Sequence, residues 1–94
     1  MPHFTVIAYD IVDDKRRLRV MKAVENFGDR VQDSVYEVLL ERPVFERLRR
    51  RIADLIDPQE DTVRYYHLCA ACWARIERDG VGPEPRQEQD LMIL

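Results

Sequence analysis

Asp10 is the residue whose surroundings best suit it to bind a cation. It closes an otherwise apolar run that begins at Phe4, and an unpaired carboxylate there carries a desolvation cost unless a metal ion, an arginine or a helix N-terminus compensates it. One interpretation is structural: Asp10 caps the following helix or pairs with Arg17. The other is a Mg²⁺ site. Because Mg²⁺ is commonly held by one or two carboxylates plus waters and phosphates, two copies of Asp10 related by a two-fold axis would supply its protein ligands.

Basic residues form a second candidate site, for nucleic acid. Lys15, Arg19 and Lys22 are spaced four and three residues apart, which places them along one edge of a helix. Basic residues clustered on a helix face can bind a phosphate backbone without reading its sequence. The alternative is a solvated helix face with intrahelical ion pairs, such as Glu46 with Arg50 in a later segment.

The two cysteines, Cys69 and Cys72, form a single CxxC motif. If residues 69–72 continue a strand, the two sulfurs point to opposite faces of the sheet. Only His3 and His67 are then available to complete a tetrahedral zinc site. We therefore expect two buried free thiols.

Apolar periodicity predicts the elements that position the N-terminal groups. The continuous run over residues 4–11 predicts a buried strand, since it is short and rich in Val, Ile and Tyr. Asp13 or Asp14 suits the N-cap of a helix over about residues 14–27. Gly28 is expected to stop this helix.

The rest of the chain predicts two or three more strands and one more helix. Residues 30–40 indicate one long strand, or two short ones joined by a bulge or turn near Asp33. Pro43 suits the first turn of a second helix, which ends before Pro58, and residues 62–71 predict a further strand. This order is that of a ferredoxin-like (split βαβ) fold of the α+β class, an antiparallel sheet with two helices on one face.

The C-terminus predicts an extra strand. Residues 79–86 are rich in Gly and Pro and indicate a linker, and the chain ends on the apolar run 91–94. An apolar end behind a linker is typical of a docking strand, here 87–94, on its own sheet or on a second copy of the chain. We expect one domain over residues 1–94.

Positive and negative residues are unevenly distributed along the chain. The net charge of −3 over 94 residues is the sum of −3 in residues 1–14, +5 in residues 15–51 and −5 in residues 52–94. A hydrophobic share of 46% argues against disorder. The longest apolar run near the N-terminus, residues 4–8, is too short to span a membrane and has no cleavage signature behind it, so we expect a cytoplasmic protein that binds no membrane.

Several motifs within residues 9–37 occur together. They are Tyr9-Asp10-Ile11 at the end of the first strand, Asp13-Asp14-Lys15-Arg16-Arg17 at the start of the helix, Gly28, Arg30-Val31-Gln32, and Ser34-Val35-Tyr36-Glu37. With the length and element order of the whole chain, this combination resembles the CRISPR-associated endoribonuclease family Cas2. A phenylalanine is common in the family where Tyr36 stands, which is a mild departure.

The resemblance implies a ferredoxin-like homodimer in which the C-terminal strand of each subunit extends the sheet of the other. It also implies a Mg²⁺ ion near the dimer axis, held by the aspartate that ends the first strand, which is Asp10 here. Members of the family are described as metal-dependent nucleases acting on RNA or DNA. They are also described as the bridge of a complex with the Cas1 integrase, which inserts new spacers in antiviral defence.

Two functions are therefore expected. In the first, the protein is an endonuclease in which Asp10 is the catalytic, metal-binding residue and Arg16 or Arg17 offsets charge in the transition state. In the second, it is a non-catalytic scaffold in which basic residues hold the DNA backbone and Asp10 is structural. The nucleic-acid-binding residues predicted are Lys15, Arg16, Arg17 and Arg19. The choice between RNA and double-stranded DNA stays open, and a small-ligand-binding module is a third alternative.

Overall fold

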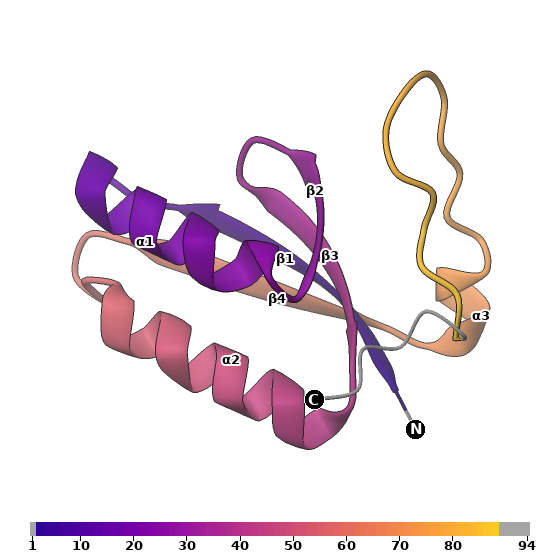
Figure 1. Cartoon of the computed structure of the whole chain (residues 1–94), viewed down its shortest axis with the longest axis horizontal. Helices are drawn as coiled ribbons and strands as arrows, with labels where there is room; N and C mark the ends of the chain where they lie inside the picture. The colour runs from indigo at the N-terminus through magenta and orange to yellow at the C-terminus, as the bar shows by residue number, and fades with distance from the viewer. Residues whose placement is uncertain (1, 89–94) are drawn as a thin grey trace.

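The chain folds into a four-stranded antiparallel sheet with two long helices on one face (Figure 1). The computed structural model describes residues 2–88. Its elements are β1 (His3–Asp10), α1 (Asp14–Glu25), β2 (Gly28–Gln32), β3 (Val35–Leu40), α2 (Arg42–Leu55), β4 (Thr62–Leu68) and α3 (Ala70–Trp73). The strand order β2-β3-β1-β4 places β1 and β3 in the centre and confirms the predicted ferredoxin-like arrangement. Of the predicted docking strand, residues 89–94 lie outside the described residues.

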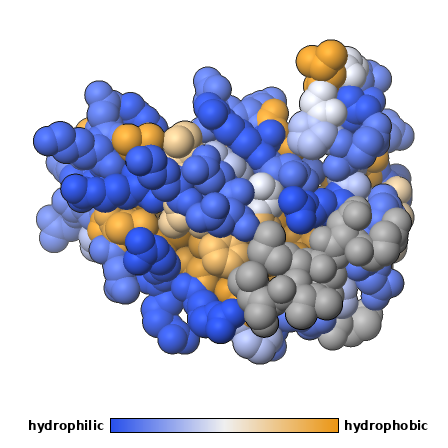
Figure 2. Space-filling view, in the orientation of Figure 1, coloured by the Kyte–Doolittle hydropathy of each residue, from blue (hydrophilic) through white to orange (hydrophobic). Residues whose placement is uncertain are grey.

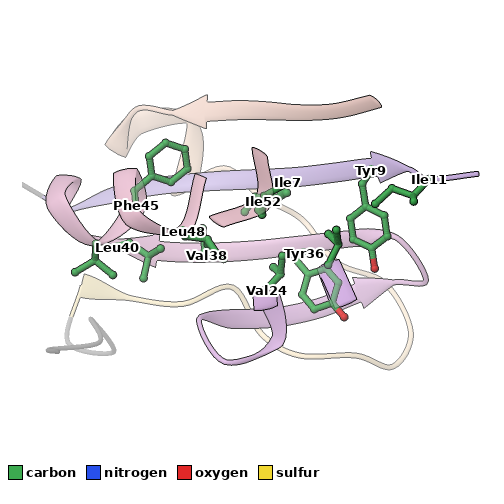
Figure 3. Close-up of a cluster of buried hydrophobic side chains, with 12 residues drawn as sticks. Ile7, Tyr9, Ile11, Val24, Tyr36, Val38, Leu40, Phe45, Leu48 and Ile52 are labelled. Carbon is green, nitrogen blue, oxygen red and sulfur yellow. The ribbon is translucent and has the colours of Figure 1, made fainter. Parts of the chain in front are cut away.

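Alternation along the strands directs one set of side chains to the helices. In β1, Ile7 and Tyr9 face α1 and α2 and are buried, whereas Val6 and Ala8 face the other side of the sheet and are half-buried. Figure 3 shows the resulting core between sheet and helices. It consists of Ile7, Tyr9, Ile11, Val20, Val24, Tyr36, Val38, Leu40, Val44, Phe45, Leu48 and Ile52.

The boundaries of α1 confirm one prediction and correct another. Asp13 is the N-cap and accepts the Arg16 backbone N–H at 2.9 Å. The helix ends at Glu25, before the predicted Phe27, and Gly28 does not stop it but begins β2. A Cβ on Gly28 would lie 2.2 Å from the Glu37 carbonyl oxygen. The glycine is therefore needed for the close approach of β2 to β3.

The structure confirms one of the two alternatives for residues 30–40 and shortens the strand predicted after α2. Residues 30–40 belong to two strands joined by a turn at 33–34, with β2 beginning at Gly28 and a register shift between Arg30 and Gln32. The strand predicted over 62–71 ends at Leu68, and the helix α3 follows it. Alanine at two of its four positions favours a helix there. Within the described part of the chain, no helix is long and apolar enough to cross a membrane.

Residues after α3 fold back on the sheet face that α1 and α2 leave open. The Trp73 ring lies 5.0 Å from the Phe4 ring, and its Nε1–H donates to the Arg86 carbonyl oxygen at 2.6 Å. The Arg86 guanidinium binds both carboxylate oxygens of Asp29 in β2, at 2.8 and 3.1 Å. The predicted linker 79–86 is thus anchored to the fold at its end.

A buried carboxylate, Asp61, ties together the loops at one end of the sheet. Its side chain is fully buried and accepts four hydrogen bonds: from the Val12 and Asp57 backbone N–H groups at 3.0 and 2.8 Å, and from Arg16 Nε and Nη2 at 2.9 and 3.2 Å. Arg16 also contacts Glu60 at 3.0 Å. These bonds, with that of the Arg16 guanidinium first, lower the pKa of Asp61 to about 2. The β1–α1 loop, α1 and the α2–β4 loop therefore share one anchor.

We expect Asp61→Asn to destabilise the protein in a pH-dependent way. Because the folded-state pKa of Asp61, about 2, lies below its ordinary value of 3.8, the carboxylate stabilises the fold above about pH 4 and loses this contribution as the pH falls toward 2. Denaturant midpoints measured at neutral pH and at several values down to pH 2 should show the variant well below wild type at pH 7 and converging with it in acid.

The matched control is Glu60→Gln, which alters an exposed partner of the same arginine. Its midpoint should stay close to that of wild type, since exposed ion pairs contribute little. A constant difference between wild type and Asp61→Asn at every pH would contradict the ionised anchor.

Candidate functional site

The side chain of Asp10 is exposed at the end of β1. Asp10 pairs through its backbone with Thr62 of β4, and strand alternation places its side chain on the face opposite the helices, with Ala8. It makes no hydrogen bond or ion pair with any residue that the structure describes. The carboxylate therefore is not desolvated within one chain, and it is free to bind a ligand.

This placement overturns the structural interpretation of Asp10. The helix cap is Asp13, one loop further on. Arg17 donates instead to the Ile11 carbonyl oxygen at 3.0 Å and to the Asp14 carboxylate. Asp10 therefore neither caps the helix nor pairs with Arg17, the two structural roles that would have explained it without a ligand.

The donor chemistry at Asp10 suits Mg²⁺, but one chain supplies too few ligands. An exposed carboxylate is a hard oxygen donor of the kind Mg²⁺ prefers. Among residues 2–88, however, no group of three or more His, Cys, Asp or Glu side chains could hold a metal ion. A site built on Asp10 therefore requires water, phosphate oxygens or a second copy of the chain.

Arg16, predicted to bind nucleic acid, is occupied within the fold. Its guanidinium is bonded to Asp61 and Glu60, and its side chain is 23% exposed. A phosphate that took this guanidinium would leave the buried carboxylate of Asp61 without its charged partner, which is costly. Its contacts show that Arg16 stabilises the loops β1–α1 and α2–β4 through Asp61.

Arg17 lies at the rim of a hollow that sequence reasoning missed. The hollow, of about 550 Å³, is also lined by Tyr9, Arg30 and Ser34. It brings together two arginines, 17 and 30, that come from α1 and β2, and each also contacts a neighbouring acid, Asp14 or Asp33. A basic rim of this kind can accept a phosphate group.

Tyr9, at the floor of this hollow, is not suited to act as a general base. Its ring stacks on Tyr36 at 6.2 Å between centroids. Burial, followed by the charge of Tyr36 and the hydrogen bond to it, raises the pKa of Tyr9 to about 12. The phenol is therefore protonated at neutral pH and cannot take up a proton as a general base.

The other predicted basic residues are free of partners. Lys15, Arg19 and Lys22 are exposed, and their side chains make no hydrogen bond or ion pair within residues 2–88. Figure 2 shows mainly hydrophilic residues over the two helices, with hydrophobic residues between them. There, Arg19 and Lys22 of α1 border a hollow of about 640 Å³ together with Arg51 of α2. The basic edge predicted from α1 thus continues onto the second helix.

A third basic hollow lies at the opposite end of α2. It has a volume of about 380 Å³, and its lining includes Arg42, Arg49, His3 and His67. Arg49 lies over the Tyr65 ring at 5.0 Å. The sequence offered two interpretations of the arginines of this helix, a phosphate-binding face and a solvated face. Only the spacing of seven residues between Arg42 and Arg49 could have placed these two together.

The two cysteines are exposed, so the expectation of buried thiols is wrong. Residues 69–72 are not a strand: Cys69 caps α3 and Cys72 lies within it. The expected placement of the two sulfurs on opposite faces of a strand is therefore wrong, because both residues belong to one helical turn.

Comparisons with known proteins agree with this architecture. The family model described as CRISPR associated protein Cas2 matches residues 3–76. The chain is 45% identical over 92 residues to a protein of Chloroflexus aurantiacus named CRISPR-associated endoribonuclease Cas2 1, which covers 97% of this chain and 99% of the relative.

Solved structures show the same fold. The crystal structure of a hypothetical protein, TT1823, from Thermus thermophilus matches with a TM-score of 0.79 and 37% identity, covering 92% of this chain and all of that one. A chain of a partial Cas6-RT-Cas1–Cas2 complex matches with a TM-score of 0.70 and 29% identity, covering 81% of this chain and 83% of that one. From its sequence and its fold, the chain belongs to the CRISPR-associated Cas2 family.

Proposed function

We propose that this chain is a Mg²⁺-dependent endonuclease that hydrolyses phosphodiester bonds in RNA or DNA and takes part in spacer acquisition in antiviral defence. The observation that carries the proposal is the carboxylate of Asp10 at the end of β1, which is exposed and has no partner among residues 2–88. The name of the Chloroflexus relative, an endoribonuclease, supports the nuclease activity.

The active form in this proposal is a homodimer. One chain offers a single carboxylate, and a two-fold axis near Asp10 would double it. The sheet face that carries Asp10 is suited to such contact, since Val6 and Ala8 are half-buried there and Tyr66 is 49% exposed. The docking strand 87–94 is the second expected contact between the subunits.

Each residue of the site then has a defined role. The two Asp10 carboxylates hold Mg²⁺, which when bound polarises the phosphodiester and lowers the pKa of the attacking water. Arg17, whose side chain is 45% exposed, is better placed than Arg16 to contact the phosphate, since Arg16 is committed to Asp61. Tyr9 is not assigned as a general base, because it faces α1 and α2 on the other side of the sheet from Asp10 and keeps its proton at neutral pH.

A second function, a DNA-binding scaffold that bridges Cas1 integrase dimers, is favoured by a different observation. Lys15, Arg19 and Lys22 form an exposed basic edge, and their side chains make no ion pair with any residue in the described part of the chain. A structural relative occurs in a complex whose name includes Cas1. In this function the basic edge holds the DNA backbone without reading its sequence, and Asp10 has no chemical role.

The nuclease proposal is tested by Asp10→Asn, which removes the negative charge while keeping the size of the side chain. With Mg²⁺ present, cleavage of single-stranded RNA and of double-stranded DNA should fall by about a hundredfold or more, since the variant loses the metal ligand itself. Initial rates on labelled substrates, with and without chelator, measure the effect and identify which nucleic acid is cut.

The control is Asp54→Asn, the same change at an exposed aspartate of α2. It should cleave like wild type. Equal, chelator-insensitive cleavage by wild type and Asp10→Asn would reject the metal-dependent nuclease, and absence of cleavage by wild type would leave the scaffold as the function.

The basic edge is tested by Lys15→Glu combined with Arg19→Glu. Both side chains are exposed and make no ion pair with the residues that the structure describes, so the fold should be unaffected. The corresponding change at Arg16 would also break the Asp61 anchor. DNA binding should weaken for every sequence, and the slope of log K against log salt should fall by about one for each phosphate that the protein no longer neutralises.

Arg75→Glu with Arg42→Glu makes the same change in net charge at two exposed positions, and Arg42 lies at the opposite end of α2 from Arg51. Its salt slope should match that of wild type. If both double variants lower the slope equally, the basic edge of α1 is not the surface that binds DNA.

A further inference from the structure

The hollow at the start of α2, of about 380 Å³, has no part in the proposed function. Three elements line it: β1 with His3, α2 with Arg42, Phe45, Glu46 and Arg49, and β4 with His67. The spacing of the α2 residues places them on one face of the helix. His3 and His67 are diagonal neighbours on one face of the sheet, because Thr5 pairs with His67 and His3 lies two residues from Thr5. A helix and two paired strands, rather than a loop, therefore position the groups of this hollow.

A buried hydroxyl fixes the ring of His67. Thr5 is fully buried, and its Oγ1 lies 2.9 Å from His67 Nδ1. A buried hydroxyl hydrogen needs an acceptor, and with Nδ1 as that acceptor a neutral His67 carries its own hydrogen on Nε2. The ring also packs edge-on against Phe45, with 5.1 Å between the centroids and 80° between the planes. His67 therefore presents an oriented N–H donor to the hollow.

The guanidinium of Arg49 is oriented by a ring and not by a carboxylate. It lies over the Tyr65 ring at 5.0 Å, and Tyr65 packs edge-on against Phe45 at 5.6 Å between centroids. Within residues 2–88 it makes no ion pair, although Glu46 lies three residues before it on the same helix. Its N–H groups are therefore available to a phosphate, which arginine binds in a bidentate way.

The composition of the lining suits an organic phosphate better than a simple anion. Two arginines and two histidines favour an anion, but a simple anion leaves the Glu46 carboxylate without a donor. Sugar hydroxyl groups can donate to this carboxylate, and Phe45 offers an apolar surface. The volume lies at the lower end of the range for small-molecule sites. A phosphate, a sugar and a flat base together match these groups.

We propose that the hollow at the start of α2 binds a nucleoside monophosphate. Arg49 and the Nε2–H of His67 hold the phosphate, Glu46 accepts hydrogen bonds from the ribose hydroxyls, and the base lies over Phe45. The hollow is at the start of β1, whereas Asp10 is at the other end of this strand and on the opposite face of the sheet. It takes one nucleotide and not a duplex, so it is also separate from the basic edge of α1.

The experiment is a calorimetric titration of the full-length protein in a buffer free of phosphate and Mg²⁺. The probes are adenosine 5′-monophosphate (AMP), ribose 5-phosphate, adenosine and inorganic phosphate. AMP should bind once per chain with a Kd of about 1 mM or tighter. The other three should each bind at least about tenfold more weakly, because each lacks the base, the phosphate or the sugar.

Arg49→Gln tests the position of the phosphate. It removes the charged donor and should weaken AMP binding about tenfold or more. The matched control is Arg47→Gln, the same change at an exposed arginine of α2 outside this lining, and it should bind AMP like wild type. Circular dichroism checks that both variants are folded.

Four results would each overturn the proposal. They are no AMP binding by wild type, equal affinity for AMP and ribose 5-phosphate or inorganic phosphate, unchanged AMP binding in Arg49→Gln, and equal losses in Arg49→Gln and Arg47→Gln. Since the titration contains no Mg²⁺ and measures no cleavage, its failure leaves the nuclease proposal untouched, and failure of the nuclease proposal leaves this one untouched.

Discussion

The buried carboxylate of Asp61 is the interaction on which this end of the molecule depends. It joins the loop after β1, the first turn of α1 and the loop before β4 through four hydrogen bonds, two of them from Arg16. A buried charge is stable only with such partners, so the three segments are held in one arrangement. That arrangement fixes the end of β1, where Asp10 projects from the side of the sheet opposite the helices.

The basic residues of α1 are of two kinds, those bound to the Asp61 anchor and those exposed to solvent. Arg16 serves the fold, while Lys15, Arg19 and Lys22 remain available on α1, and Arg51 extends their edge onto α2. Carboxylate and basic edge thus lie on different faces of the sheet. The proposed metal-dependent cleavage and the proposed backbone binding would therefore use different surfaces of one domain, and the net charge of −3 describes neither surface.

Sequence alone predicted what depends on local pattern. The element order, the ferredoxin-like sheet and the Asp13 cap follow from periodicity and capping residues. The Asp61 anchor could not be predicted, because Arg16 and Asp61 are 45 residues apart and nothing near either one marks the other. Sequence alone also could not predict that Arg17 and Arg30 line one hollow, because they lie on different elements and no local pattern connects them. The error at the CxxC was local: a strand was extended into residues that form a helical turn, which also reversed the expected burial of both thiols.

The central claim is that two chains share one Mg²⁺ ion through Asp10, and the stoichiometry of binding tests it most directly. Calorimetric titration of metal-free protein with Mg²⁺, at a concentration where sedimentation shows its assembly state, should give one ion for every two chains and no measurable binding for Asp10→Asn. Binding of one ion by each chain, or binding unchanged in Asp10→Asn, would contradict the account.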